Sequence, residues 1–182
     1  MTRREVWVYL GCLGLAPLAK AWEFVYFRSQ VSPDLTLPIA CAAGWLCDVP
    51  AAVLAGFSTG LIADAFTGRL IGLTSMTLTV AAFISSWAKR FISPDMPFSR
   101  SMAALISSGA ADLAAYWVLK ASGISIDTAY FFKSILPANV LWSFILVVPF
   151  EGLLRGISLA FSRLWPDEAK RKVGGFPYEP NA

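Results

Sequence analysis

The sequence predicts an all-α integral membrane protein with about six transmembrane helices and both termini in the cytoplasm. Hydrophobic residues make up 57% of its 182 residues and charged residues only 15%, whereas soluble domains carry about 25% charged residues. Long apolar runs alternate with short connectors that hold charges or proline. Because one transmembrane helix needs about 20 residues, we expect a polytopic transmembrane domain over residues 1–164 and a basic cytoplasmic tail over 165–182.

Six apolar runs are the expected spans. The first covers residues 5–27 and carries aromatic side chains near both ends, which is typical of membrane interfaces. The next two, 35–47 and 51–66, are short for a full crossing, so whether they cross fully or form a tilted or partly re-entrant pair stays open. The remaining runs cover 70–87, 101–121 and 137–161.

The distribution of lysine and arginine sets the expected orientation. With the N-terminus inside, ten of these residues lie on the cytoplasmic side and four on the outer side, which agrees with the excess of positive charge found in cytoplasmic loops. The net charge of +3 requires no nucleic acid as a partner. Anionic membrane lipids are the ordinary partners of such basic ends.

The most regular pattern in the sequence is a stripe of small residues. Gly56, Gly60 and Asp64 recur every four residues and therefore share one face of a helix, and Gly68 and Gly72 continue the spacing. A bare backbone face of this kind lets a second helix approach closely. Packing within this protein is the favoured interpretation, and the docking of a partner's helix is the alternative.

A second pair of small residues, Gly152 and Gly156, has the same spacing near the end of the last run. The same two interpretations apply, and packing within this protein is again favoured. Glu151 and Arg155 are four residues apart in this run, so they are expected to form an ion pair along one helix face.

Asp112 lies near the centre of the fifth run, where an ionised carboxylate costs about 2.5–3.5 kcal/mol on insertion scales. It is expected to face the bundle interior or to be protonated. A neutral or hydrogen-bonded acid that ties helices together is the favoured interpretation, and a proton, ion or ligand site is the alternative.

Asp64 ends a short run, so solvation by lipid headgroups is expected there. Lys20 and Glu23 are three residues apart and can pair on one face.

Several chemistries are excluded by the residue types that are present. The sequence has no histidine, which removes histidine-based acid–base catalysis, serine–histidine nucleophiles and histidine-ligated metals. Cys12, Cys41 and Cys47 all lie in apolar runs and are expected to be packing residues and not a disulfide framework. The sequence predicts no catalytic, cofactor-binding or metal-binding residues.

Three of these segments together resemble the rod-shape-determining protein MreD family. They are Pro33-Asp34-Leu35 at the opening of an early span, Gly56-Phe57-Ser-Thr-Gly60-Leu61-Ile-Ala-Asp64, and Gly68-Arg69-Leu-Ile-Gly72-Leu73. The length, the six-span pattern and the start of the last span fit as well, so the resemblance covers residues 6–163. Members of this family are small bacterial inner-membrane proteins, which implies a multi-pass location in the bacterial inner (cytoplasmic) membrane.

The resemblance implies a non-enzymatic scaffold that binds MreC and supports cell-shape control and peptidoglycan synthesis. It also implies an elongation complex with RodA, a class B penicillin-binding protein and the filament protein MreB. The family is similar in architecture to the S components of energy-coupling-factor transporters, so a small-molecule-binding transporter subunit is the alternative, and an intramembrane enzyme that uses acids alone is a third hypothesis. The candidates for partner binding or packing are Pro33, Asp34, Gly56, Phe57, Gly60, Asp64, Gly68, Arg69 and Gly72.

Overall fold

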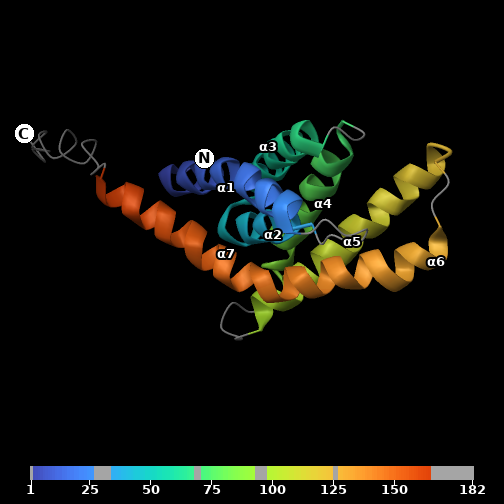
Figure 1. The fold of residues 1–182 in the computed structure, drawn as a ribbon. Helices are drawn as coiled ribbons and strands as arrows, with labels where there is room; N and C mark the ends of the chain where they lie inside the picture. The colour runs from blue at the N-terminus through green and yellow to red at the C-terminus, as the bar shows by residue number, and fades with distance from the viewer. Residues whose placement is uncertain (1, 27–33, 68–70, 93–97, 125–126, 165–182) are drawn as a thin grey trace, which may run out of the picture.

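The computed structural model describes residues 2–26, 34–67, 71–92, 98–124 and 127–164, and all regular structure in these ranges is helical. The tail over 165–182 lies outside the described residues. Each predicted span corresponds to one helical rod, and the last rod joins α6, the π-helical turn η1 and α7 without a break (Figure 1). The elements are α1 (Arg3–Tyr26), α2 (Thr36–Leu46), α3 (Val49–Thr67), α4 (Leu73–Ala88), α5 (Ser99–Ala121), α6 (Thr128–Tyr130), η1 (Phe131–Ile135) and α7 (Leu136–Leu164).

Four of these rods are long and apolar enough to cross a membrane by length and composition, namely α1, α3, α5 and the rod that ends in α7. Helices α2 and α4 are shorter. The prediction of a short third span is wrong, because α3 begins at Val49 and has 19 residues. Pro50 stands in its first turn, where the missing N–H group breaks no helical hydrogen bond. The described part of the chain is thus all-helical and compatible with a multi-pass membrane protein.

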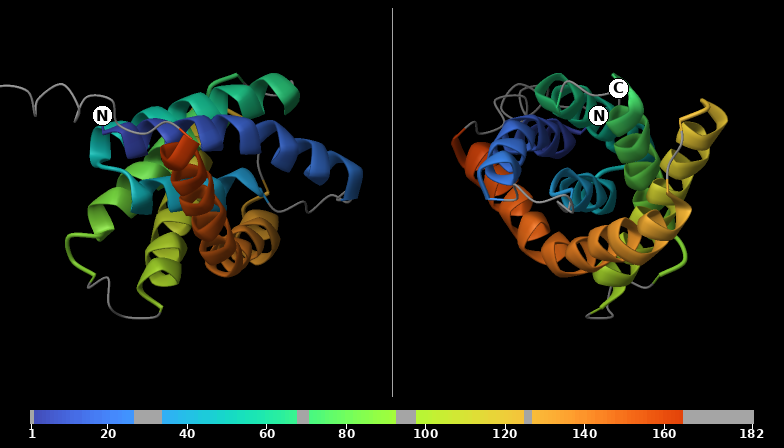
Figure 2. Two further views of the ribbon diagram at one scale, coloured as in Figure 1. Left: turned by 90° about the vertical axis from the view of Figure 1, so that its left-hand side faces the viewer. Right: turned by 45° about the vertical axis from the view of Figure 1, so that its right-hand side comes forward.

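Helix α2 is the central element, and α1, α3, α4, α5 and α7 all contact it (Figure 2). Every residue from Thr36 to Trp45 is buried. Small side chains allow this close packing, and a Cβ added at Gly44 would lie 2.5 Å from the carbonyl oxygen of Ala82 in α4. An 11-residue helix is only about 16 Å long, so the protein around α2 must satisfy the polar groups at its ends.

The consecutive helices α1 and α2 run in opposite directions, and polar contacts join their ends. At one end of the bundle, Glu5 of α1 accepts a hydrogen bond at 2.9 Å from the backbone N–H of Asp48, which lies between α2 and α3. At the other end, the ammonium group of Lys20 in α1 lies 3.0 Å from the carboxylate of Asp34, just before α2. The start of α1 therefore lies beside the end of α2, as expected for consecutive antiparallel spans.

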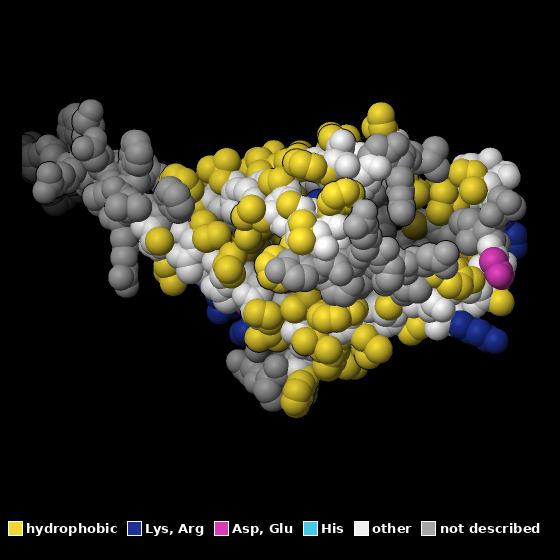
Figure 3. All heavy atoms as spheres, in the orientation of Figure 1, with side chains coloured by type: hydrophobic (Ala, Val, Ile, Leu, Met, Phe, Trp, Pro, Cys, Tyr) yellow, Lys and Arg dark blue, Asp and Glu magenta, His cyan; other side chains and the backbone are white. Residues whose placement is uncertain are grey.

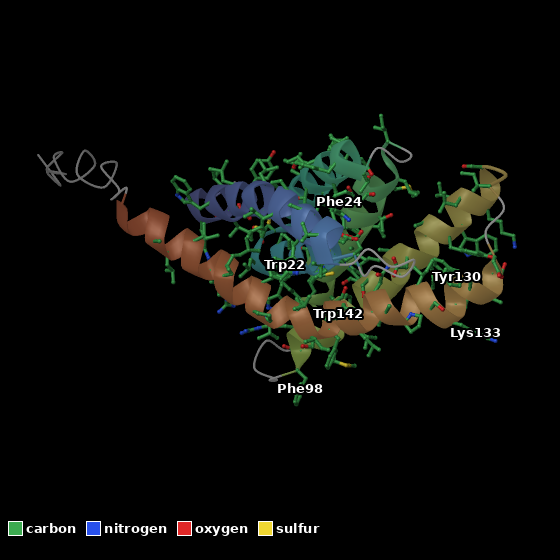
Figure 4. All side chains as sticks on the ribbon, viewed as in Figure 1. Trp22, Phe24, Phe98, Tyr130, Lys133 and Trp142 are labelled. Carbon is green, nitrogen blue, oxygen red and sulfur yellow. The ribbon has the colours of Figure 1, made fainter. Side chains whose placement is uncertain are left out.

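The exterior is largely apolar. Hydrophobic side chains cover much of the described surface in Figure 3, and most of the charged side chains visible there lie at its margins. Phe24 is 85% exposed at the end of α1, close to the exposed Trp22, and Phe98 is exposed at the start of α5 (Figure 4). An exposed apolar surface of this extent is compatible with a lipid environment.

The last rod begins at Thr128, well before the predicted start of the sixth span at residue 137. The side chain of Asp127 caps it by accepting hydrogen bonds from the backbone N–H groups of Ala129 and Tyr130, at 2.9 and 3.4 Å. The π-helical turn precedes Pro137, which has no N–H group to continue the α-helical pattern. At its C-terminal end, α7 projects beyond the other helices (Figure 1).

Candidate functional site: buried polar contacts between the helices

Gly56 and Gly60 lie directly against the backbone of α4. A Cβ added at Gly56 would lie 2.6 Å from the carbonyl oxygen of Leu78, and one at Gly60 would lie 2.2 Å from the Cα of Ser75. Neither position accepts a larger side chain without a backbone shift. Packing within this protein is therefore confirmed for this pair, and α4 already occupies the face that a partner's helix would need.

Asp64 is only 1% exposed at the end of α3, where it binds the start of α4. Its carboxylate accepts hydrogen bonds from the backbone N–H groups of Gly72, Thr74 and Ser75 at 2.8, 3.2 and 3.2 Å. The first N–H groups of a helix have no acceptor within the helix, and negative charge is favoured beside them. The expectation that headgroups solvate Asp64 is wrong, because the N–H groups at the start of α4 bind its carboxylate.

Gly72 makes this arrangement sterically accessible. Its φ angle of 98° lies in the left-handed region, which glycine adopts without a steric penalty.

Phe57 has a different role from its neighbours, since its side chain is 49% exposed. Its carbonyl oxygen accepts a hydrogen bond from the Ser75 hydroxyl group at 2.9 Å. Gly68 and Arg69 lie outside the described residues.

Asp34 joins α1 to the start of α2. Its Oδ1 atom accepts hydrogen bonds from the ammonium group of Lys20 and from the backbone N–H of Thr36, both at 3.0 Å. Lys20 also pairs with Glu23 at 2.9 Å, so that predicted pair is confirmed. Burial raises the pKa of Asp34, but the Lys20 charge and the Thr36 hydrogen bonds outweigh burial and hold this pKa below its usual value. Pro33 lies outside the described residues.

Asn139 of α7 connects Asp34 to Asp112 of α5. Its side-chain oxygen accepts a hydrogen bond from the backbone N–H of Asp34 at 3.1 Å, and its amide group donates to Oδ1 of Asp112 at 3.3 Å. Asp112 is 6% exposed, which confirms that it faces the bundle interior. Its Oδ2 atom is buried and has no hydrogen-bond partner among the described residues. One chain of polar contacts thus runs from α1 through Asp34 and α7 to α5.

Glu151 of α7 lies further along the interface between α5 and α7 and is 1% exposed. Its carboxylate is 2.6 Å from the guanidinium group of Arg155 and 3.2 Å from that of Arg100 on α5. The predicted Glu151–Arg155 pair is confirmed, and Arg100 turns it into a link between two helices. A buried carboxylate needs such compensation because taking a charge out of water is unfavourable.

Gly152 and Gly156 lie on an open side of α7. A Cβ added at either position would meet no described atom within 4 Å, and both residues are exposed. The expectation of packing within this protein is therefore wrong for this pair. The reason is that the two glycines lie on the outward side of α7, while its opposite side, with Glu151 and Leu154, is buried against other helices. The same four-residue spacing that is covered in α3 is therefore uncovered here.

The three cysteines are buried and free, as expected. Cys47 lies between α2 and α3, and its thiol is buried, as befits a packing residue. Its carbonyl oxygen accepts hydrogen bonds from Ser86 and Lys89, which follow from the packing of α4 beside the α2–α3 corner. Among the described residues, no group of three or more histidine, cysteine, aspartate or glutamate side chains could hold a metal ion.

Sequence reasoning did not identify Arg100, Asn139 or Ser143 as members of the polar interface between α5 and α7. Asn139 and Ser143 are buried in α7, at 8% and 0% exposure. The available signal was weak, because each is a single polar residue near or within an apolar run. The partners of Arg100 and Asn139 are distant in the sequence, so only the packing of two helices brings them together.

Comparison with known proteins finds no match to a family model, a curated protein or a solved structure. Functional assignment therefore depends on the residues of this chain and on the contacts they make.

Proposed function

We propose that this protein is a non-enzymatic membrane scaffold of the MreD type, which binds MreC in the bacterial inner membrane. The observation that supports this proposal is the structural role of the resembling segment. Gly56, Gly60, Asp64 and Gly72 all serve one joint, in which α3 packs on α4 and caps it. The resemblance therefore rests on residues with a common structural purpose and not only on hydropathy.

The proposed topology has six spans with both termini in the cytoplasm, in an architecture similar to that of the S components. It is supported by the basic residues that gather at one end of the bundle. Lys89 contacts the carbonyl oxygen of Cys47 beside the start of α1, and Arg100 at the start of α5 reaches α7. MreC is the direct partner in this proposal, and RodA, a class B penicillin-binding protein and MreB complete the elongation complex.

The open side of α7 is where the MreC contact is best tested. Gly56 and Gly60 are covered by α4, so a Gly60→Leu variant would lose its fold and could not report on a partner. Gly152 and Gly156 leave a bare backbone stripe that a transmembrane helix could approach closely. At 29 residues α7 is about 44 Å long, which exceeds the roughly 30 Å hydrocarbon core.

Copurification with MreC from membranes tests the proposal. We expect Gly152→Leu with Gly156→Leu to lower MreC recovery several-fold while the thermal midpoint of the purified protein stays unchanged. The matched control is Gly14→Leu, because Gly14 is also an exposed helical glycine with no described atom near an added Cβ. Failure of the unchanged protein to recover MreC would refute the function, whereas undiminished recovery by the double variant would refute only this docking face.

The alternative function, a small-molecule-binding transporter subunit, is favoured by one observation. Asp112 and Ser143 both have a buried oxygen atom without a partner among the described residues, and such atoms can orient a polar ligand. A thermal-shift screen of water-soluble vitamins tests this function, because a ligand that binds the folded state raises the midpoint. The transporter function requires a shift that Asp112→Asn abolishes, and a screen without any shift would reject it.

A further inference from the structure

The buried acids of the described chain differ in how their negative charge is compensated. Glu5 accepts hydrogen bonds from the backbone N–H groups of Thr2 and Asp48, and the half-buried Asp34 has a lysine ammonium group. Asp64 has three backbone N–H groups, and Glu151 has two guanidinium groups. Asp112 has none of these. The hydrogen bond described for its carboxyl group comes from the neutral amide of Asn139, at 3.3 Å, and its second oxygen has no partner among the described residues.

Two contacts define how α5 and α7 are aligned. Asp112 meets Asn139, and Arg100 meets Glu151. The two members on α5 are twelve residues apart, and so are the two members on α7, in the opposite direction. The helices are therefore antiparallel and keep one register over about three turns. This register determines which side chains face one another between the two contacts.

One turn from Asp112, the register places Ser108 of α5 opposite Ser143 of α7, and both are fully buried. The hydroxyl group of Ser108 donates to the carbonyl oxygen of Leu105 in its own helix at 3.3 Å. The hydroxyl oxygen of Ser143 has no partner among the described residues. Among the described residues, the hydrogen bond to the Asp112 carboxyl group thus comes from a neutral group, and no cation is described that would compensate a negative charge there.

We propose that Asp112 is a proton-binding site, at which the folded protein holds a proton on Oδ2 at neutral pH and the neutral carboxyl group joins α5 to α7. The proton comes from water and returns to water when the site empties. An ionised carboxylate would stand in the bundle core with one neutral amide as its compensation, which is unfavourable. A protonated carboxyl group is neutral, so it removes the uncompensated charge from the core and keeps its other oxygen for Asn139.

The elements around Asp112 carry few other titratable groups. The negative charge of Asp34, linked to it through one asparagine, opposes a second negative charge. Lys20 is engaged by Asp34 and by a second acid. Helix α2 contributes Cys41, a buried free thiol, and on α5 itself the hydroxyl group of Tyr116 is hydrogen-bonded to α6. The buried residues of α4 carry no acidic or basic side chain.

Infrared spectroscopy of the full-length protein in lipid nanodiscs tests the proposal directly. A protonated carboxyl group has a carbonyl stretching band that a carboxylate lacks. At neutral pH, the unchanged protein should show this band, Asp112→Asn should lose it, and the control Asp34→Asn should retain it. The asparagine variant keeps the shape and the neutral state of the proposed group, so it should fold. An identical band in Asp112→Asn and the unchanged protein would overturn the proposal.

The pH dependence of stability is a second, independent readout. Because the folded protein would hold a proton that the unfolded chain releases, the free energy of unfolding must fall as pH rises. The thermal midpoint of the unchanged protein should therefore fall relative to that of Asp112→Asn as pH rises from about 4, where the unfolded chain releases the proton, up to the pKa of the folded site. A bound cation would give another result, namely stabilisation by sodium or potassium at constant ionic strength that Asp112→Asn abolishes, and this result would also overturn the proposal.

Discussion

The carboxylate of Asp64 lies 2.8 Å from the backbone nitrogen of Gly72, and this contact closes the joint between α3 and α4. Gly72 is the N-cap residue of α4 and has no side chain that could bind the free N–H groups of the first turn. Asp64 supplies the missing acceptor from the preceding helix, and it also binds the N–H groups of Thr74 and Ser75. It is therefore a helix cap contributed by another helix.

Replacement of Asp64 by alanine is expected to destabilise the protein strongly. Three N–H groups would lose their acceptor, and each buried unsatisfied group costs about 1–3 kcal/mol. Thermal unfolding of the purified protein in detergent measures the effect. Asp48→Ala is the control, because Asp48 stands directly before α3 and its side chain is exposed. Equal midpoints for the two variants would contradict the capping role of Asp64.

Arg100→Gln is expected to lower the free energy of unfolding by about 1–2 kcal/mol. Glu151 would keep only one of its two cations, and the 34% exposure of Arg100 reduces the loss below that of a fully buried pair. Adding Glu151→Gln should restore part of the stability, because it removes the poorly compensated charge. A double-mutant cycle measures this coupling, with the exposed Lys133→Gln as control. Strictly additive effects would show that the two residues do not interact.

The pairing of Asp34 with Lys20 predicts a loss of stability in acid. Although burial raises the pKa of Asp34, the lysine charge outweighs it and holds this pKa below 3.8. The stabilisation is therefore fully present above about pH 5 and is lost as pH falls below about 4, where the folded state must take up a proton. The midpoint difference between the unchanged protein and Asp34→Asn should shrink over that range. A difference that is independent of pH would contradict the pairing.

The positions of the helices were largely predictable, because a span is a local property of the sequence. The fifth span, predicted over residues 101–121, is the helix Ser99–Ala121. The glycine stripes show the limit of local reasoning. Gly56 and Gly60 are covered by α4, whereas Gly152 and Gly156, at the same spacing, are uncovered. Spacing shows that a helix face is bare, but the course of the other helices determines whether that face is occupied.

The sequence by itself determined which segments are helical and apolar, because hydropathy, proline positions and small-residue spacing all act within about 20 residues. Only the tertiary structure decided what each buried acid binds. The partners of Asp64 are backbone N–H groups, which almost every residue possesses and which leave no signal in the sequence. Asp112 meets Asn139 because two helices pack in one register. That register results from the fit of whole helix surfaces and cannot be read from either segment alone.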